Sequence, residues 1–234
     1  MTTLLHPGMK LSLLWKFFAL AFSALLPLVN PLGSAILFVG FVGDVPIELY
    51  RSLARRIAVN VLIFFAVIEL IGSAILNFFG ISLPIVQVSG GLVIAAMGWS
   101  LLNQQDDSKG EKKLLKTEAD EVSNTLNQKS FYPFTFPLTV GPGSLVVTLT
   151  LSAQATQATL PETLIAHAGI FLAAIAMSLS VLVCYANAPR ITRAISPTAA
   201  HGILRVVAFF LLCIGVQIAW NGLHTLITPL LHHA

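Results

Sequence analysis

Long apolar runs interrupted by helix-breaking residues constrain this chain more than any other feature. The first run extends from about Leu11 to Val42 and contains Asn30-Pro31 near its middle. It is too long for one straight transmembrane helix, which needs about 20 residues. Because proline removes a backbone donor and clashes with the preceding turn, we expect one broken helix or a helix followed by a re-entrant half-helix. The run continues past any cleavage site near residues 19–24, which argues against a secretory signal peptide.

The sequence around this interruption is echoed in the second half of the chain. Residues 27–34 read PLVNPLGS and residues 137–144 read PLTVGPGS, and we call them the first break and the second break. Each break puts proline, glycine and small polar residues inside an apolar run. In lipid, the backbone groups freed by such a break must be covered by protein or by a hydrated cavity. Two breaks at matching places in two halves indicate a midplane binding site in a transporter.

The composition is that of an integral membrane protein. Of 234 residues, 56% are hydrophobic and 10% are charged, whereas a soluble domain carries about 25% charged residues. The basic residues lie between apolar runs, which is typical of cytoplasmic loops and not of a nucleic-acid-binding face. Cys184 and Cys213 each lie inside an apolar run without metal-ligand spacing, so we expect packing roles, no disulfide, no metal and no cofactor.

Apolar runs and polar intervals divide the chain into two halves. Residues 44–56 and 188–201 are predicted to be loops, and the polar, mixed-charge segment 104–130 is predicted to link the halves. The domains are therefore 1–103, 104–130 and 131–234. The predicted membrane segments are the broken segment 11–42, the spans 57–79 and 85–102, the broken segment 131–151, and the spans 164–186 and 203–226.

Three spans in each half make the two repeats inverted, because an odd number of crossings brings the second half in from the opposite face. The expected fold is all-α, with six transmembrane helices as two inverted three-helix repeats whose first helices are broken. Gly90, Gly91 and Gly98 in the third span are expected to allow close helix packing.

The distribution of lysine and arginine predicts the orientation. Lys10 and Lys16 fall on the side of the N-terminus, which leaves 11 of the 13 basic residues on the other side. The positive-inside rule then places both termini in the periplasm and the charged loops in the cytoplasm. The 11 residues are Arg51, Arg55, Arg56, Lys109, Lys112, Lys113, Lys116, Lys129, Arg190, Arg193 and Arg205.

Several polar side chains fall inside predicted spans. A carboxylate at mid-span costs about 3 kcal/mol to insert, so Glu69 should be neutral, paired or turned towards a cavity. Glu69 and His167 are candidates for proton coupling; the alternative for Glu69 is a protonated carboxyl bonded to a neighbouring helix. A second polar set either lines a path or forms interhelical hydrogen bonds. That set is Asn60, Gln87, Gln217 and Asn221.

No residue pattern supports an enzyme. Gly141-Pro142-Gly143 does not follow a predicted strand and is not a phosphate-binding fingerprint. Ser144 lacks the frame of a hydrolase nucleophile and has no partner set of histidine and carboxylate. We therefore expect no catalytic residues.

Four motifs in order resemble the MarC family of inner-membrane proteins. They are Asn30-Pro31-Leu32-Gly33, the segment 79–92 (FGISLPIVQVSGGL), the segment 139–144 (TVGPGS), and Arg205 followed by Gly215-Val216-Gln217 and Asn221-Gly222. The resemblance implies a six-span bacterial inner-membrane protein, distantly akin to lysine-exporter-type carriers, and some members look like transporters of small neutral amino acids such as alanine and glycine. Glu69 lies outside the family pattern.

These observations predict a secondary transporter of small neutral amino acids or similar small metabolites. Asn30, Thr139 and Ser144 would offer side-chain hydrogen bonds, and the glycines would expose backbone amides to a carboxylate. The expected partners are the substrate, protons or sodium, and the lipid bilayer, and no nucleic acid. The predicted binding residues are Asn30, Pro31, Gly33, Ser34, Thr139, Gly141, Pro142, Gly143 and Ser144.

Two alternatives from other classes stay open at this point. One is a non-transporting scaffold or regulatory membrane protein, with the linker as its docking element. The other is a passive channel, whose flux would not saturate.

Overall fold

The computed structural model describes residues 7–43, 45–103, 130–195 and 197–231. Every regular element in these ranges is a helix, which confirms the all-α class. The predicted linker lies outside the described residues, except for Ser130, which begins η1. The helices are α1 (Pro7–Val29), α2 (Pro31–Val42), α3 (Ile47–Phe78), α4 (Leu83–Leu102), η1 (Ser130–Thr139), α6 (Pro142–Gln154), α7 (Leu160–Ala186), α8 (Ala188–Ala194) and α9 (Pro197–Leu231).

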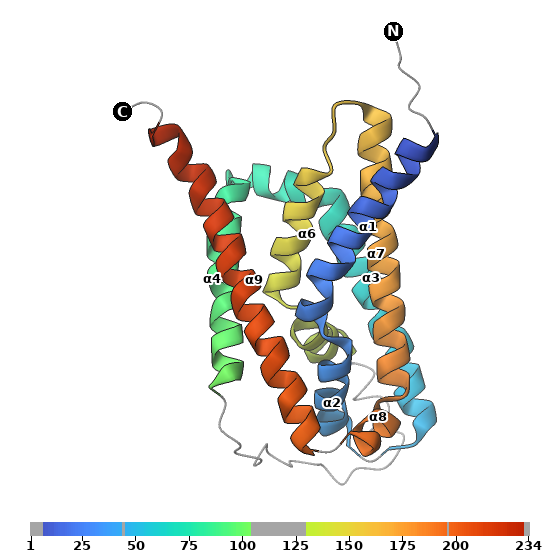
Figure 1. Ribbon diagram of the computed structural model, residues 1–234. Helices are drawn as coiled ribbons and strands as arrows, with labels where there is room; N and C mark the ends of the chain where they lie inside the picture. The colour runs from blue at the N-terminus through green and yellow to red at the C-terminus, as the bar shows by residue number, and fades with distance from the viewer. Residues whose placement is uncertain (1–6, 44, 104–129, 196, 232–234) are drawn as a thin grey trace.

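The long helices run side by side along one direction (Figure 1). α1 continues into α2, while α3 rises beside α7 and then bends over the upper end towards α4. The first turn of α1 and the last turn of α9 lie at the upper end, and α8 lies at the lower end. α7 packs against both α1 and α3, whereas α4 packs mainly against α9.

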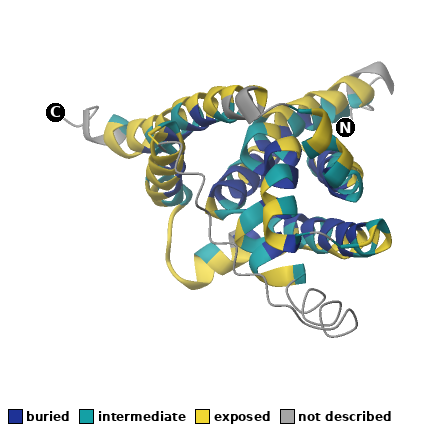
Figure 2. Ribbon diagram, turned by 90° about the horizontal axis from the view of Figure 1, so that it is seen from below, coloured by how far each residue is buried: buried dark blue, intermediate teal, exposed yellow. Residues whose placement is uncertain are grey.

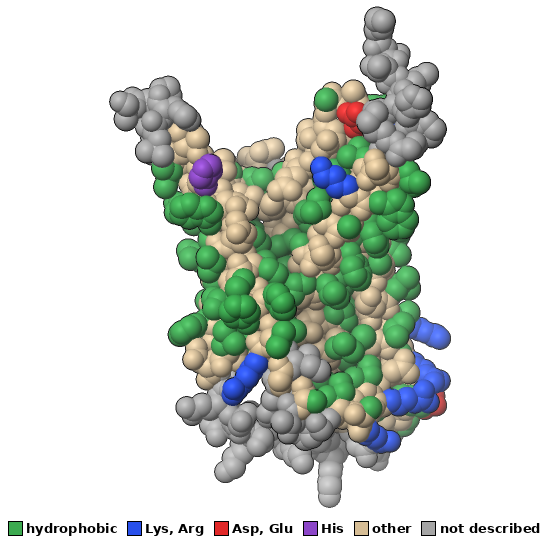
Figure 3. Space-filling view, viewed as in Figure 1, with side chains coloured by type: hydrophobic (Ala, Val, Ile, Leu, Met, Phe, Trp, Pro, Cys, Tyr) green, Lys and Arg blue, Asp and Glu red, His purple; other side chains and the backbone are tan. Residues whose placement is uncertain are grey.

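Four helical segments are long and apolar enough to cross a membrane, and the bent pair η1–α6 would be a fifth if it forms one span. α3 contains the predicted second span but is not among these candidates within the described residues. Hydrophobic side chains cover the middle of the face in Figure 3. The candidates are Lys10–Val42, Leu83–Leu102, Leu160–Ala186 and Leu204–Thr228.

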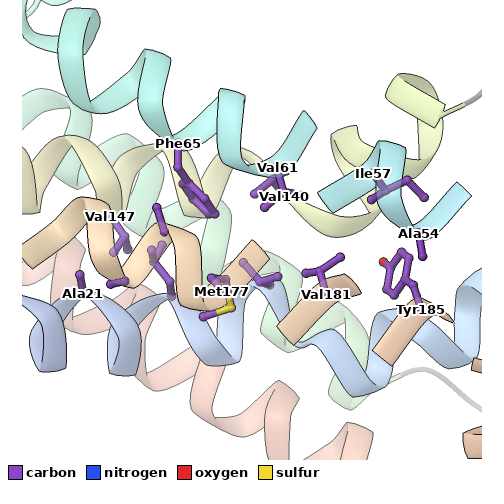
Figure 4. Close-up of a cluster of buried hydrophobic side chains, with 14 of the residues drawn as sticks. Ala21, Ala54, Ile57, Val61, Phe65, Val140, Val147, Met177, Val181 and Tyr185 are labelled. Atoms are coloured by element: carbon purple, nitrogen blue, oxygen red, sulfur yellow. The ribbon is translucent and has the colours of Figure 1, made fainter. Parts of the chain in front are cut away.

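The hydrophobic core forms where α1, α3, α6 and α7 meet. In Figure 4, Val61 and Phe65 of α3 point towards the α7 side chains Met177 and Val181. These residues are four apart on each helix and fully buried, so one stripe of each helix faces the other. Figure 2 shows the buried residues turned inward and exposed residues over the outer faces.

Glycines bring α4 and α9 into backbone contact. A Cβ atom added at Gly91 or Gly98 of α4 would meet backbone atoms of α9. One added at Gly215 or Gly222 of α9 would meet backbone atoms of α4. The predicted packing role of Gly90, Gly91 and Gly98 is confirmed, with Gly90 packed against Val146 of α6.

Two predicted loops are wrong in part, because both contain helix. α3 begins at Ile47, so its arginines lie on the first turns of a helix and not in a loop. The buried residues Tyr50, Leu53, Ala54 and Ile57 continue the apolar stripe through this charged region, as an amphipathic helix does. Similarly, residues 188–194 form α8, and α9 already begins at Pro197.

Candidate functional site

The first break is closed by the side chain of Asn30. This residue has the left-handed conformation, with φ 41° and ψ 65°, and separates α1 from α2. Its Oδ1 accepts a hydrogen bond from the Gly33 amide at 3.1 Å, which caps α2. Pro31 occupies the first turn of α2, where a missing amide proton costs nothing.

Ser34 satisfies the carbonyl groups that this break frees. Its Oγ lies 2.7 Å from the carbonyl oxygen of Val29 and 2.5 Å from that of Asn30, and donates to them. Ser34 is buried, and the Asn30 side chain occupies the place that a Cβ on Gly33 would need. The carbonyl groups of Val29 and Asn30, the Gly33 amide and the Ser34 hydroxyl are thus bonded within the break itself.

The second break has fewer hydrogen bonds of its own than the first break. η1 and α6 are bent by 69°, and Gly141 precedes α6 in an extended conformation without a side-chain cap. The Ser144 amide donates to the Gly141 carbonyl at 3.1 Å. Ser144 is 1% exposed as a whole residue, yet its hydroxyl has no hydrogen-bond partner among the described residues. This buried group marks the N-terminus of α6 as a place with spare hydrogen-bonding capacity.

Tyr185 of α7 connects the two breaks. The hydroxyl of Thr139, at the end of η1, donates to the Phe134 carbonyl at 2.6 Å and therefore accepts from the Tyr185 hydroxyl at 2.7 Å. The Tyr185 hydroxyl also interacts with Ser34 of α2. Sequence reasoning missed Tyr185, although a hydroxyl in an apolar run is itself a signal of polar contacts inside the protein.

The residues of the two breaks line two different spaces. Asn30 and Pro31 line a largely apolar groove of about 660 Å³ between α1, α2, α7 and α9. Gly141, Gly143 and Ser144 line a much smaller cavity of about 60 Å³. The other walls of this cavity are Leu28, Ile94, Met97, Pro137, Leu138 and Leu211.

The predicted binding residues are therefore only partly brought together. Gly143 faces Leu28, so the first turn of α6 packs on the last turn of α1, beside the first break. Ser34 and Thr139 meet at Tyr185. Pro142 is exposed at the start of α6. In this conformation the Oδ1 atom of Asn30 accepts from its own helix.

Glu69 of α3 and His167 of α7 form a hydrogen-bonded pair. The Glu69 Oε1 atom lies 2.5 Å from the His167 Nδ1 atom, and the Glu69 backbone carbonyl accepts from the Ser152 hydroxyl at 3.2 Å. The Glu69 side chain is 4% exposed, whereas the His167 side chain is 33% exposed. The Glu69 Oε2 atom is buried without a hydrogen-bond partner in the part of the chain that the structure describes. The two candidate coupling residues are thus in direct contact across α3 and α7.

Two of the other polar residues form interhelical hydrogen bonds, as one of the two predicted roles requires. Asn60 donates to Thr135 across α3 and η1 at 3.3 Å, and Gln87 donates to Thr150 across α4 and α6 at 3.4 Å. These two form interhelical bonds. Gln217 bonds along α9, donating to Asn221 at 2.9 Å, and both are exposed.

The candidate site contains no arrangement for a metal. Within residues 7–43, 45–103, 130–195 and 197–231, no three His, Cys, Asp or Glu side chains are grouped to hold an ion. Both cysteines are free, Cys184 half-buried and Cys213 exposed on α9. Cys213 is thus not the buried thiol that its apolar surroundings in the sequence suggest.

Long apolar helices, two interrupted helical segments and the interhelical pair of Glu69 and His167 define an integral membrane protein with polar groups at its interior. Residues 15–227 match the family described as "MarC family integral membrane protein". The chain belongs to the MarC family. This confirms the resemblance found in the motifs.

Three relatives show the extent of the match. The UPF0056 inner membrane protein MarC of Salmonella typhimurium is 29% identical over 213 residues, covering 89% of this chain and 95% of the relative. The protein of that name from Citrobacter koseri has the same identity and coverage. The one from Escherichia coli is 29% identical over 217 residues, covering 90% and 95%. No solved structure matches this chain.

Proposed function

We propose that this protein is a secondary transporter of small neutral amino acids or similar small metabolites. The observation that carries the proposal is the Ser144 hydroxyl, which is buried and unpartnered among the described residues, at the N-terminus of α6, and lines a cavity. A buried hydroxyl without a partner is costly, so a ligand that bonds it would bind favourably. A transporter needs a site that binds its substrate without changing it chemically, and the Ser144 hydroxyl would serve that purpose.

The chemistry of the cavity favours a carboxylate with a small apolar or uncharged group. The N-terminus of a helix carries partial positive charge, and α6 is 13 residues long. The amides of its first turn and the Ser144 hydroxyl would bind the carboxylate. Leu28, Ile94 and Met97 offer nothing to a charged side chain, and no charged side chain lines the cavity among the described residues.

The cavity is small in this conformation, so transport requires it to open. Its neighbours are the α4–α9 pair on one side and the end of α1 on the other. Opening there would join the cavity to the groove along Asn30 and Pro31, since residues of α9 border both spaces. Asn30, Gly33, Ser34 and Thr139 would then complete the proposed binding site.

The architecture that we propose for this transporter is two inverted three-helix repeats that give six spans. The support is the pairing of corresponding helices: the second helix of each half, α3 and α7, pack together, as do the third, α4 and α9. The first helix of each half is broken. The proposed orientation follows the positive-inside rule, with both termini in the periplasm and the charged loops in the cytoplasm.

Counterflow of labelled alanine into proteoliposomes tests the proposal. We expect saturable exchange in the native protein and a rise in KM of about tenfold to 100-fold in Ser144→Ala, because a hydrogen bond to a charged group contributes about 1.5–3 kcal/mol. Ser89→Ala is the matched control, since the Ser89 hydroxyl is exposed and bonds to its own helix at Ile85. No exchange of alanine, glycine or serine by folded protein would remove the amino-acid assignment, and flux that does not saturate would indicate a channel.

We further propose that protons couple to transport through Glu69 and His167, with sodium as the alternative ion. The pair combines a buried carboxylate with a partly exposed imidazole, which gives protons a route to a buried acceptor. Glu69→Gln should abolish uptake driven by a pH gradient but retain alanine exchange. Glu48→Gln, an exposed acid of the same helix, is the control. Unchanged proton-driven uptake in Glu69→Gln would assign coupling to another group or to sodium.

A further inference from the structure

A second cavity, different in character from the proposed substrate site, lies where α2 ends, α3 begins and α8 passes. Its volume is about 390 Å³. Unlike the substrate cavity and the apolar groove, it is lined by arginine side chains. Its residues are Val39, Gly43, Val45, Ile47, Tyr50, Pro189, Arg190, Thr192 and Arg193.

The walls of this cavity are fixed by buried contacts. The Tyr50 hydroxyl donates to the Gly43 carbonyl at 2.7 Å, which holds the turn after α2 against the start of α3. The Tyr50 ring is 2% exposed and packs edge-on against Phe38 at 5.7 Å between ring centroids. On the other wall, Thr192 donates to the Ala188 carbonyl at 2.9 Å within α8. The cavity is therefore part of the folded structure and not a gap between loosely held side chains.

Among the described residues, the charged side chains that line this cavity are both arginines. Arg190 and Arg193 are three residues apart on α8, so their side chains lie on the same face of the helix. Both are exposed, and no acidic side chain lines the cavity among the described residues. Two guanidinium groups side by side match the geometry of a phosphate, which each can bind through paired hydrogen bonds.

The cavity also lies where candidate membrane spans end. Two candidate spans end beside it, Lys10–Val42 and Leu160–Ala186. Figure 3 shows Lys and Arg side chains gathered towards this lower end and hydrophobic side chains above them. Val39, Val45 and Ile47 line the cavity together with the arginines, so the space is apolar on one side and cationic on the other.

We propose that this cavity binds one anionic phospholipid, with Arg190 and Arg193 on its headgroup phosphate and the aliphatic residues against its glycerol and first methylenes. Basic pockets between transmembrane helices are the recognised setting for anionic headgroups. A free phosphate ion would leave the aliphatic wall unused, which favours the lipid as the occupant. The inference is independent of the transport proposal, since the cavity shares no residue with the substrate site.

Native mass spectrometry of the purified chain in detergent tests this inference. We expect one phosphatidylglycerol to stay bound when phosphatidylcholine is removed. R190Q/R193Q should weaken retention about 25-fold, from about fivefold for each basic residue near an anionic headgroup. R55Q/R56Q is the matched control, because it removes the same charge from exposed residues that do not line the cavity. It should retain the lipid as the native protein does.

Three other outcomes of this experiment would overturn the inference, and each would identify a different cause. Equal losses in the two double variants would show general attraction between basic residues and anionic lipid. Equal retention of phosphatidylcholine would exclude a role for headgroup charge, and displacement of the lipid by millimolar inorganic phosphate would identify a free anion as the occupant. Should R190Q/R193Q fail to fold, R190K/R193K keeps the charge but loses the planar fork, and retention equal to that of the native protein would overturn the arginine assignment.

Discussion

The two breaks have similar sequences but opposite hydrogen-bonding states. At the first break, the Asn30 side chain caps α2 and Ser34 bonds to the carbonyl groups that the break frees. At the second, Gly141 has no side chain to act as a cap and the Ser144 hydroxyl has no partner among the described residues. The serines occupy matching places in the two motifs, yet one closes its break and the other leaves it open.

This difference indicates separate tasks for the two breaks. A break that satisfies its own backbone groups can persist in lipid without any ligand, so the first break is explained by structure alone. The second break leaves a buried donor unused, which is the property that a binding site needs. For the proposed transporter, the second break would make the first contact with the substrate, and the first break, which is closed in this conformation, would join the site only after the cavity opens.

The largest expected effect comes from Gly143→Ala compared with Gly33→Ala. A methyl group on Gly143 would collide with Ile94 and Leu28, which line the small cavity, so exchange should fall more than about tenfold and stability by about 1–3 kcal/mol. A methyl group on Gly33 would displace only the Asn30 side chain and cost about 1 kcal/mol as a lost cap, with exchange retained. Alanine counterflow and thermal unfolding in detergent measure both. Equal losses of exchange would mean that the breaks share one task.

A smaller effect separates two contributions of Asn30 to stability, its left-handed backbone conformation and the hydrogen bond by which it caps α2. Asn30→Ala loses the cap and forces a side chain into the left-handed region, for a total of about 2–3 kcal/mol. Asn30→Gly adopts that region freely and should lose only a few tenths of a kcal/mol. Unfolding in denaturant, compared between the two variants, measures the difference. Similar losses would show that the backbone at the first break is not strained by its conformation.

The smallest effect concerns the link between the breaks. Tyr185→Phe removes the bond to Thr139 but leaves Thr139 donating to the Phe134 carbonyl, so the loss should be about 1 kcal/mol. A double-mutant cycle with Thr139→Val gives the coupling energy between the two residues directly. A coupling energy near zero would show that the breaks are held together by packing and not by this hydrogen bond.

The positions of the breaks can be predicted from sequence because their causes are local. Proline and glycine interrupt a helix wherever they occur, so Asn30-Pro31 and Gly141-Pro142 are enough to mark both interruptions. Whether a break is closed depends on side chains that fold back onto it. The motif predicts a binding role for Asn30 but does not reveal that its Oδ1 atom also caps α2.

Features that depend on contacts between distant segments cannot be predicted in this way. The pairing of Glu69 with His167 joins α3 to α7, and no periodicity in either helix reveals the partner. The beginning of α3 is different, because its apolar stripe through Leu53 and Ile57 is present in the sequence. The charged residues between these positions make the segment resemble a loop, although they lie on the outer face of a helix.

The backbone contact between α4 and α9 has a consequence for how the protein is made. α4 ends at Leu102 and α9 begins at Pro197, so about 95 residues are synthesised between them, which takes about 5–20 seconds at cellular rates. During that interval the backbone contact that Gly91 and Gly98 of α4 make with α9 cannot form, because α9 has not yet been made. A helix of the second half is therefore needed before the third helix of the first half can complete its packing.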